Sequence, residues 1–258
     1  MTLIPTDRPA VDVVTLTWND GDLLARSVEA TLASTGVEVT LTIVDNCSDP
    51  SPVAPPDPRV RVIRNITNRG VRARNQGVRV GSSDFVAFVD SDACVHPDTL
   101  ATLVATLQTN PDAALAAPVF DGQAPDRSAG AAPTLTRKLC RLVGLTRSYC
   151  SNSGSREAVW DVDFAVSACW VFRRSVFTAL GGLDERYFYG PEDLDFCLRA
   201  RLAGWRVIQV SGAGCAHAAR RRFRSPLSPL GARHTLAVGR HLWKHRHFRR
   251  LLAQTAAP

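Results

Sequence analysis

Two aspartates that directly follow an apolar run are the residues in this sequence best suited to chemistry. Residues 85–89 read Phe-Val-Ala-Phe-Val, and Asp90, Ser91 and Asp92 come next. So short an apolar run predicts a strand buried on both faces, as in a parallel sheet under helices. Asp90 and Asp92 then lie at the carboxyl end of the strand, the ligand-binding edge of open α/β folds. Two carboxylates this close repel unless a cation or several donors separate them, so we expect a divalent metal site or a polar turn.

A second group of acidic and aromatic side chains occupies residues 183–195. Pro191 suits the start of a helix, and acids at a helix start are stabilised by its dipole, which accounts for Glu192 and Asp193 without catalysis. The surplus of acids exceeds what capping needs. The aromatic residues offer walls for a sugar, and an acid among them can abstract a proton from an acceptor hydroxyl, a step worth roughly 10²–10⁴-fold.

Histidines offer two weaker signals. His217 follows a strand that we expect to end at Val210, so a ligand role and a structural role both stay open. His241 and His245 are four residues apart in a basic segment with no carboxylate nearby in the sequence. We therefore expect no metal site at this pair.

Strand and helix patterns alternate along the chain. Apolar β-branched runs predict strands, and helical spacing with caps and stop signals predicts helices. Residues 121–157 predict a mobile loop over the site. The alternation predicts an α/β fold with a mainly parallel sheet and right-handed crossovers. We expect strands at 11–17, 39–44, 60–63, 85–89, 113–119, 159–166, 168–172 and 205–210. We expect one helix to begin after the first strand, with Asn19 or Asp20 as its N-cap, and the other helices to lie at 70–80, 97–109, 173–180, 192–202 and from 229 onward.

The charge distribution divides the chain in two. Residues 1–195 carry 24 acidic and 18 basic side chains, whereas residues 196–258 carry 13 Lys and Arg and no acid. A basic tail is typical of proteins that meet phosphates, nucleic acid or anionic lipid, although a solvated helix has the same composition. The seven scattered cysteines favour reduced thiols. Residues 1–9 do not resemble a signal peptide and no run of about 18 apolar residues occurs, so we expect a cytoplasmic protein.

Taken in order, the motifs resemble those of inverting family 2 glycosyltransferases of the GT-A fold, close to the bacterial rhamnosyltransferase-like branch. The resemblance covers residues 11–218. It implies a Rossmann-like GT-A domain over 1–218, with a mixed, mainly parallel sheet flanked by helices, and a basic helical tail over 219–258. The matching segments are Thr17-Trp18-Asn19, residues 44–49 and residues 68–77 for the nucleotide, Asp90-Ser91-Asp92 for the metal, and residues 181–188 and 192–199 for the acceptor.

The resemblance also implies a role for each matching residue. Trp18 would stack on a pyrimidine base, Asp45 would hydrogen-bond its edge, and Arg74 would lie near the base or the phosphates. Asp92 would bind Mn²⁺ or Mg²⁺ directly with His217 as a second ligand, and Asp90 would hold the ribose or an outer-shell water. Asp193 would deprotonate the acceptor hydroxyl, with Glu192 as the rival base and a binder of acceptor hydroxyls. The remaining implied residues are Thr17, Asn19, Asn46, Asn75 and Ser91 for the nucleotide, and Trp170 and Tyr189 for the acceptor.

The implied reaction moves a sugar, with inversion, from a UDP- or dTDP-type donor to an acceptor hydroxyl. The basic tail favours a glycan acceptor on polyprenyl diphosphate at the inner membrane face, because each Lys or Arg near an anionic surface adds roughly 1 kcal/mol. A soluble natural product or peptide acceptor, and a nucleotide-sugar-binding protein without catalysis, are the alternatives. We expect no nucleic-acid partner, since the rest of the chain is acidic and contains no reader motif.

Overall fold

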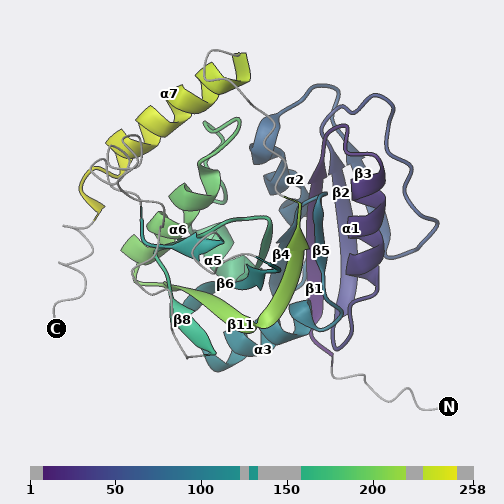
Figure 1. The fold of residues 1–258 in the computed structure, drawn as a ribbon, viewed down its shortest axis with the longest axis horizontal. Helices are drawn as coiled ribbons and strands as arrows, with labels where there is room; N and C mark the ends of the chain where they lie inside the picture. Colours follow the sequence, from purple (N-terminus) through teal and green to yellow (C-terminus); the bar gives the residue numbers. More distant parts are fainter. Residues whose placement is uncertain (1–7, 123–127, 133–157, 219–228, 249–258) are drawn as a thin grey trace.

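A mixed sheet lies between two layers of helices in the computed structural model, which describes residues 8–122, 128–132, 158–218 and 229–248 (Figure 1). Most of the expected 121–157 loop and, in the basic tail, residues 219–228 and 249–258 lie outside these residues. The strands are β1 Ala10–Thr17, β2 Glu38–Asp45, β3 Val60–Arg64, β4 Phe85–Val89, β5 Ala93–Val95, β6 Ala113–Phe120, β7 Ala129–Gly130, β8 Val159–Asp161, β9 Phe164–Ala165, β10 Cys169–Arg173 and β11 Arg206–His217. The helices are α1 Asp22–Leu32, η1 Gly70–Ala73 (a 3₁₀ turn), α2 Arg74–Val80, α3 Thr99–Thr109, α5 Arg174–Ala179, α6 Glu192–Leu202 and α7 Pro229–Lys244.

The main sheet has the strand order β3-β2-β1-β4-β10-β6-β11-β5, with β8 paired to β11. Strands β3, β2, β1 and β4 are parallel to one another, and β6 is parallel to β11. Strand β10 runs antiparallel between β4 and β6, and β5 and β8 run antiparallel to β11. The predicted mixed, mainly parallel sheet flanked by helices is confirmed.

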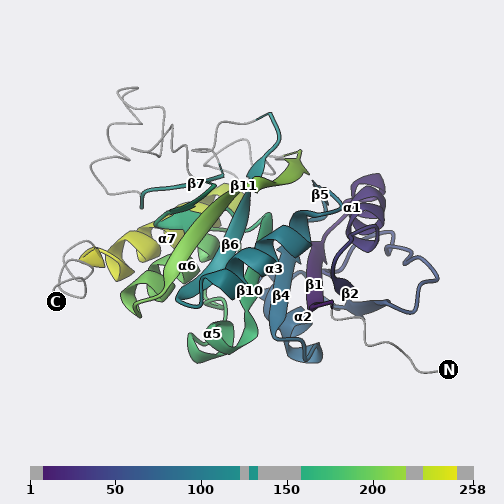
Figure 2. The same ribbon diagram turned by 90° about the horizontal axis from the view of Figure 1, so that it is seen from below.

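Strand β4 is buried on both faces, as its apolar run predicts. Ala87 and Val89 belong to the core under α1 and α3, whereas Val86 and Phe88 belong to the core under α2, α5 and α6. Figure 2 shows α3 along one side of these strands. Full burial of a side chain such as Phe88 is worth roughly 1.5–3 kcal/mol, so β4 is firmly held and the residues that follow it start from a fixed point.

Three details differ from the sequence-based expectations. Helix α1 begins at Asp22 after Gly21, and no side chain caps it; the predicted N-caps are wrong because the Asp20 carboxylate is used elsewhere. The expected strand over residues 159–166 is two short strands, since β8 pairs with β11 and β9 pairs with β7. Strand β11 continues beyond Val210 to its end at His217, because a register shift in its small-residue stretch lets pairing with β6 resume.

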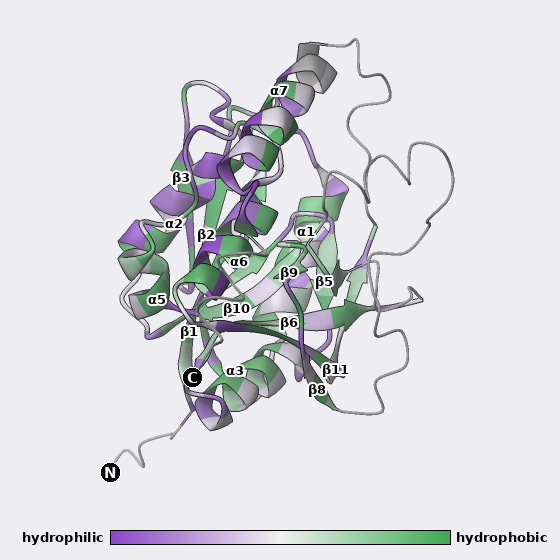
Figure 3. Ribbon diagram, turned by 90° about the vertical axis from the view of Figure 1, so that its left-hand side faces the viewer, coloured by the Kyte–Doolittle hydropathy of each residue, from purple (hydrophilic) through white to green (hydrophobic). Residues whose placement is uncertain are grey.

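Helix α7 lies outside the sheet beside α6, on the side opposite α1 (Figure 1). Figure 3 shows that polar and apolar residues alternate along α7, whereas the strands are mainly apolar. The division of the chain at residue 218 stays a prediction. Within the described ranges, no helix combines the length and the apolar character needed to cross a membrane.

Candidate active site

The strand ends bring the predicted chemical residues to one edge of the sheet. Strand β1 ends at Thr17, β2 ends at Asp45, and β4 ends one residue before Asp90. Strand β11 has the same direction as these strands, so it also ends at this edge, with His217. Strand β10 has the opposite direction and starts here, which places Ser167 beside the same edge. Residues from distant parts of the sequence therefore meet because of strand direction alone.

Asp90, Asp92 and His217 form a compact group of three side chains that could bind a metal ion. One ligand atom from each lies within 4.8 Å of the others. The His217 Nε2 atom is 3.5 Å from Asp92 Oδ1, and the Phe120 ring packs 4.9 Å from the imidazole. Burial tends to lower the pKa of His217, but its hydrogen bond to Asp92 and the two acidic charges outweigh burial and raise the pKa. Carboxylate oxygens and an imidazole fit Mn²⁺ or Mg²⁺.

Arg74 connects this group with the start of α6. Its guanidinium is buried, forms an ion pair with Asp90 and donates to Ser167 Oγ at 2.9 Å. The same guanidinium lies 3.6 Å from Glu192 Oε1 and 5.3 Å above the Phe88 ring. Burial alone would lower the pKa of Arg74, but the nearby carboxylates raise it, so Arg74 is charged. A fixed positive charge thus joins the metal-binding aspartates to the candidate base.

Glu192 and Asp193 are held differently although they are neighbours. Glu192 is 5% exposed, and its Oε2 atom has no hydrogen-bond partner among the described residues. Burial and the Asp193 charge raise the pKa of Glu192 to about 8, against the opposing effect of Arg74. Asp193 is half-buried, and its Oδ1 accepts a hydrogen bond from the Leu194 N–H at 2.7 Å. Burial raises its pKa, while backbone donors and Arg74 act against this shift.

Asp20, which the sequence did not single out as a site residue, ties the loop after β1 to the Asp-x-Asp segment. Its Oδ2 accepts hydrogen bonds from Thr17 Oγ1 at 3.3 Å, Trp18 N at 3.2 Å and Ser91 Oγ at 2.5 Å. Thr17 and Ser91 are buried, so their hydroxyls serve this connection. The signal in the sequence that could have identified Asp20 as a site residue was its position three residues after the end of β1.

The loops after β1 and β2 hold each other in place. The Trp18 side chain is 38% exposed, which leaves an aromatic face at the site edge. Asn19 has a positive φ of 58°; its N–H donates to Ser48 Oγ at 2.9 Å, and its Oδ1 accepts from Asp49 N at 2.8 Å. The Asn19 side chain therefore fixes the position of Trp18 relative to the end of β2.

Asp45 and Asn46 are buried at the end of β2. Asp45 Oδ1 accepts from Ser48 N at 2.9 Å, and Oδ2 lies 3.4 Å from Arg64 Nη1 in an ion pair. Asn46 donates to Gly70 O at 3.0 Å and accepts from Arg69 N at 3.1 Å. These contacts set the path of residues 65–70 and so of the η1 turn.

Asn75 is buried and holds the turn before the 184–190 loop. Its Nδ2 donates to Leu183 O at 2.9 Å and to Glu185 Oε1 at 3.2 Å, and its Oδ1 accepts from Leu183 N at 3.0 Å. This part of the matched nucleotide segment therefore contacts the acceptor-side signature directly. The structure gives the Asn75 side chain a positioning role.

The structure corrects the predicted acceptor contact of Trp170. Strand β10 is a central strand, and Trp170 is fully buried on it, with its ring 6.2 Å from Phe88 and 5.9 Å from Phe196. Its indole nitrogen has no hydrogen-bond partner among the residues described. Tyr189, by contrast, is half-buried in the 184–190 loop, with its ring 6.1 Å from His234 of α7.

The expectation that no carboxylate lies near His241 and His245 is also wrong. The fold brings Asp195 to both histidines, and the three side chains form a second group with ligand atoms within 4.8 Å. The Lys244 ammonium, however, lies 2.6 Å from Asp195 Oδ1. This positive charge already contacts Asp195 Oδ1 and competes with a metal ion for it, and the absence of a metal site at these histidines stays a prediction.

A cavity of about 920 Å³ lies beside the nucleotide segments, between α1 and the proline-rich loop after β2. Thr17, Asn19, Asp20 and Ser48 line the side nearest the site, and mainly apolar residues line the rest. The cavity is therefore next to the metal-binding aspartates and does not contain them.

The chain matches Glycosyl transferase family 2 over residues 12–181, about two-thirds of its length. The matched range contains most of the central sheet and the Asp90-Ser91-Asp92 segment at its carboxyl edge. The chain belongs to glycosyl transferase family 2.

Individual relatives agree with this assignment. The chain is 41% identical over 101 residues to "Succinoglycan biosynthesis protein ExoO" of Rhizobium meliloti, covering 37% of this chain and 29% of the relative. It is 40% identical over 74 residues to "N-acetylglucosaminyl-diphospho-decaprenol L-rhamnosyltransferase" of Mycobacterium tuberculosis, covering 28% and 24%. The matches thus span less than a third of these relatives' lengths. The solved mannosyltransferase PcManGT of Pyrobaculum calidifontis, in complex with GDP-Man and Mn²⁺, has the same fold, with a TM-score of 0.66, 19% identity and coverage of 98% and 70%.

Proposed function

We propose that the protein transfers a sugar, with inversion, from a nucleotide diphosphate sugar to an acceptor hydroxyl, with the help of a divalent metal ion. One observation carries the proposal: Arg74 touches both Asp90 of the metal-binding group and Glu192 at the start of α6. A diphosphate held at the metal would therefore lie within a few ångströms of the acids that could receive an acceptor proton. A binding module without catalysis has no use for this pairing.

The residues divide the chemical work by position. Asp92, Asp90 and His217 would hold Mn²⁺ or Mg²⁺, which supplies charge stabilisation to the departing diphosphate. Trp18 would stack on the base, and Asp45 would bind the base edge. Asp193 would take the proton of the acceptor hydroxyl while the hydroxyl oxygen forms a bond to the anomeric carbon and the bond from that carbon to the diphosphate breaks. A single displacement of this kind inverts the anomeric configuration.

Asp193 is a better candidate for the base than Glu192. A base must reach the substrate and must be ionised near neutral pH. Asp193 is half-buried, whereas Glu192 is 5% exposed with a pKa of about 8, so protonated Glu192 can donate a hydrogen bond to the acceptor. We expect Asp193→Asn to abolish transfer with nucleotide affinity unchanged, and substantial activity in this variant would reassign the base to Glu192.

We propose a lipid-linked acceptor at an anionic membrane face. The name of the Mycobacterium tuberculosis relative specifies a decaprenol-linked substrate. In this chain, α7 exposes Leu236 and Trp243, which are 76% and 71% accessible, together with Arg240, and Arg246 is exposed two residues after the helix. Apolar and basic residues on one helix suit the surface of an anionic bilayer. Binding to vesicles of phosphatidylglycerol but not of phosphatidylcholine supports this placement, and equal failure on both would favour a soluble acceptor.

Calorimetric titration tests the donor site. UDP, dTDP and GDP are each titrated into the protein with and without Mn²⁺. We expect one nucleotide to bind at least tenfold more tightly with metal, and Asp92→Ala to remove that gain. Asp98→Ala is the matched control, because it removes an exposed acid three residues after β5, the strand that directly follows Asp92. The absence of nucleotide binding by folded protein with Mn²⁺ present would refute the proposed function.

A further inference from the structure

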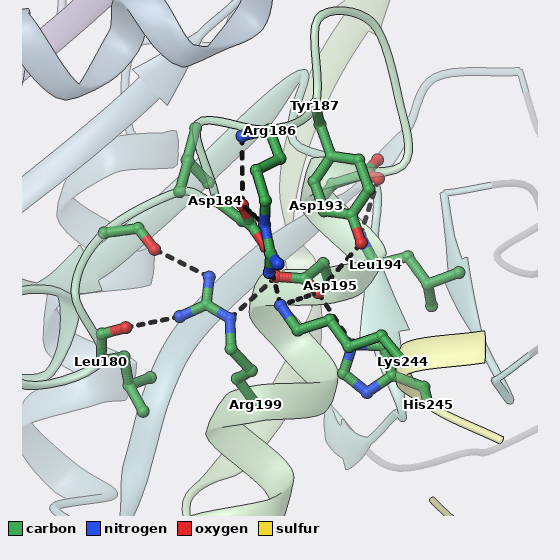
Figure 4. A network of polar contacts seen from close by, with 12 residues as sticks. Leu180, Asp184, Arg186, Tyr187, Asp193, Leu194, Asp195, Arg199, Lys244 and His245 are labelled. Atoms are coloured by element: carbon green, nitrogen blue, oxygen red, sulfur yellow. Dashed lines mark hydrogen bonds and ion pairs between the residues drawn. The ribbon is translucent and has the colours of Figure 1, made fainter. Parts of the chain in front are cut away.

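A buried carboxylate on α6 takes two of its partners from the last residue of α7 and the residue that follows it. Asp195 is fully buried, two residues after Asp193, and its Oδ2 accepts from Arg199 Nε at 2.8 Å. Its Oδ1 lies 2.6 Å from Lys244 Nζ and 2.8 Å from His245 Nε2 (Figure 4). A buried carboxylate is tolerated only with charged or hydrogen-bonding partners. The environment of the α6 start is therefore completed by residues about 50 positions later in the chain.

Lys244 also reaches the loop that precedes α6. Its ammonium is 2.9 Å from Asp184 Oδ2, and Asp184 in turn pairs with Arg186 at 2.6 Å. Figure 4 shows the Lys244 side chain between the two carboxylates of Asp184 and Asp195. A single ammonium group thus joins the first residue of the 184–190 loop to the helix that carries Asp193.

Residues near the start of α7 contact the same loop. His234 Nδ1 lies 3.1 Å from Tyr189 O, and the Arg233 guanidinium lies 5.0 Å above the Phe188 ring. The loop therefore meets α7 near both of its ends, through Arg233 and His234 in one turn of the helix and through Lys244 at its last residue.

The opposite side of the loop is attached to the donor-side segment. Val71 N donates to Phe188 O at 2.9 Å, and Arg72 Nη1 donates to Glu185 O at 3.2 Å. A Cβ atom at Gly70 would lie 2.0 Å from Phe188 O, so the two segments are in close contact. The loop lies between η1 and α7, and a change in α7 can move it relative to the donor site.

We propose that Lys244 and His245 are positioning residues that fix the 184–190 loop and the start of α6, so that Asp193 faces the bound donor. This inference rests on the proposed function, in which that loop and Asp193 meet the acceptor. Neither residue touches the donor or the reacting atoms. Removal of Lys244 should loosen the loop, impair the use of acceptor and leave nucleotide binding intact.

Hydrogen–deuterium exchange tests the placement without any substrate. Lys244→Met removes the charge and keeps most of the side-chain length, and we expect exchange of the amides of residues 184–195 to rise at least tenfold. Exchange in β1 and β4 should stay within twofold. Asp184→Asn, which removes the loop's own carboxylate and leaves Asp195 paired, should accelerate exchange in residues 184–190 as well. Arg246→Met is the matched control, because Arg246, two residues after α7, stacks 4.2 Å above Trp243 and donates to Trp243 O at 2.8 Å.

Steady-state kinetics then separates positioning from folding. With a sugar conjugate of the nucleotide that calorimetry identifies as the ligand, and an N-acetylglucosaminyl-diphospho-polyprenol of short chain, we expect Lys244→Met to lower kcat/KM for the acceptor at least tenfold. Its nucleotide Kd should stay within twofold, and Lys244→Arg should restore most of the loss.

Two results would overturn the inference. One is unchanged exchange over residues 184–195 in both variants. The other is a uniform increase along the whole chain, which would mean that Lys244 supports general stability. Because exchange needs no turnover, a wild-type protein that binds no nucleotide would refute the proposed function while the exchange result still decides the role of Lys244.

Discussion

Replacement of Glu192 by Gln should make the protein more stable in alkaline solution and leave it unchanged in mild acid. The folded protein raises the pKa of Glu192 from 4.5 to about 8, first through burial and then through the Asp193 charge. Between these two pH values, the folded state keeps a proton that the unfolded state releases. The free energy of unfolding therefore falls as the pH rises through this window, and above it the whole penalty is present.

The size of the effect follows from the pKa change. One pKa unit corresponds to about 1.4 kcal/mol, so the full penalty is roughly 5 kcal/mol at pH 9. The Gln amide stays buried beside Arg74 and keeps part of the polar burial cost, so we expect a gain of roughly 2–4 kcal/mol. At about 2 °C per kcal/mol for a chain of this size, Tm should rise by roughly 4–8 °C at pH 9. At pH 5 the two proteins should agree within about 1 kcal/mol, because Glu192 is then protonated.

Differential scanning calorimetry in metal-free buffers at pH 5, 7 and 9 measures this difference. Glu29→Gln, at an exposed position on α1, is the control and should show no pH-dependent gain. A Glu192→Gln variant that is less stable by the same amount at all three pH values would refute the reasoning, since it would show that the carboxylate is stabilised in the folded state.

Three further substitutions test separate parts of the site. Gly70→Ala should destabilise the protein by at least roughly 2 kcal/mol in urea unfolding, because the φ of Gly70 is +67° and the new Cβ would meet Phe188 O. A variant as stable as the wild type would contradict the close contact between Gly70 and Phe188. Trp170→Phe should lower stability by roughly 1–2 kcal/mol while the acceptor KM stays unchanged, and a selective rise in KM would restore the acceptor role. Ser91→Ala should lower the free energy of unfolding by roughly 1–3 kcal/mol and weaken nucleotide binding, because Asp20 loses a hydrogen-bond donor. Unaltered calorimetric titrations and unfolding curves would argue against a structural role for the hydrogen bond between Ser91 and Asp20.

The close placement of Asp90 and Asp92 at one edge of the sheet was predictable because its signal is local, whereas metal binding there stays a prediction. Asp90 and Asp92 follow a run that is apolar on both faces, so their place at a strand end can be derived without the rest of the fold. His217 was predictable only in part, since the register shift that extends β11 depends on tertiary pairing with β6. The parallel β3-β2-β1-β4 half follows directly from the alternation of strands and helices.

Trp170 and Asp195 show where local patterns fail. An aromatic residue near a signature has the same sequence appearance in a core and in a sugar-binding wall, and only the insertion of β10 between β4 and β6 makes Trp170 a core residue. Two partners of Asp195, Lys244 and His245, lie about 50 residues away and form no motif with it. The available signal was the charge asymmetry, because acids concentrated before residue 196 and bases after it can attract each other.

The dependence of Asp195 on α7 has a consequence for synthesis on the ribosome. Asp195 is made before Lys244 and His245, and at roughly 5–20 residues per second the interval is several seconds. During that time, Arg199 is the only one of its charged partners that has been made. Helix α6 can therefore form early, but the acidic start of this helix reaches its final environment only after α7 has emerged. Nascent chains that stop before α7 would present Asp195 without Lys244 and His245, and chaperones and proteases could distinguish them from complete molecules.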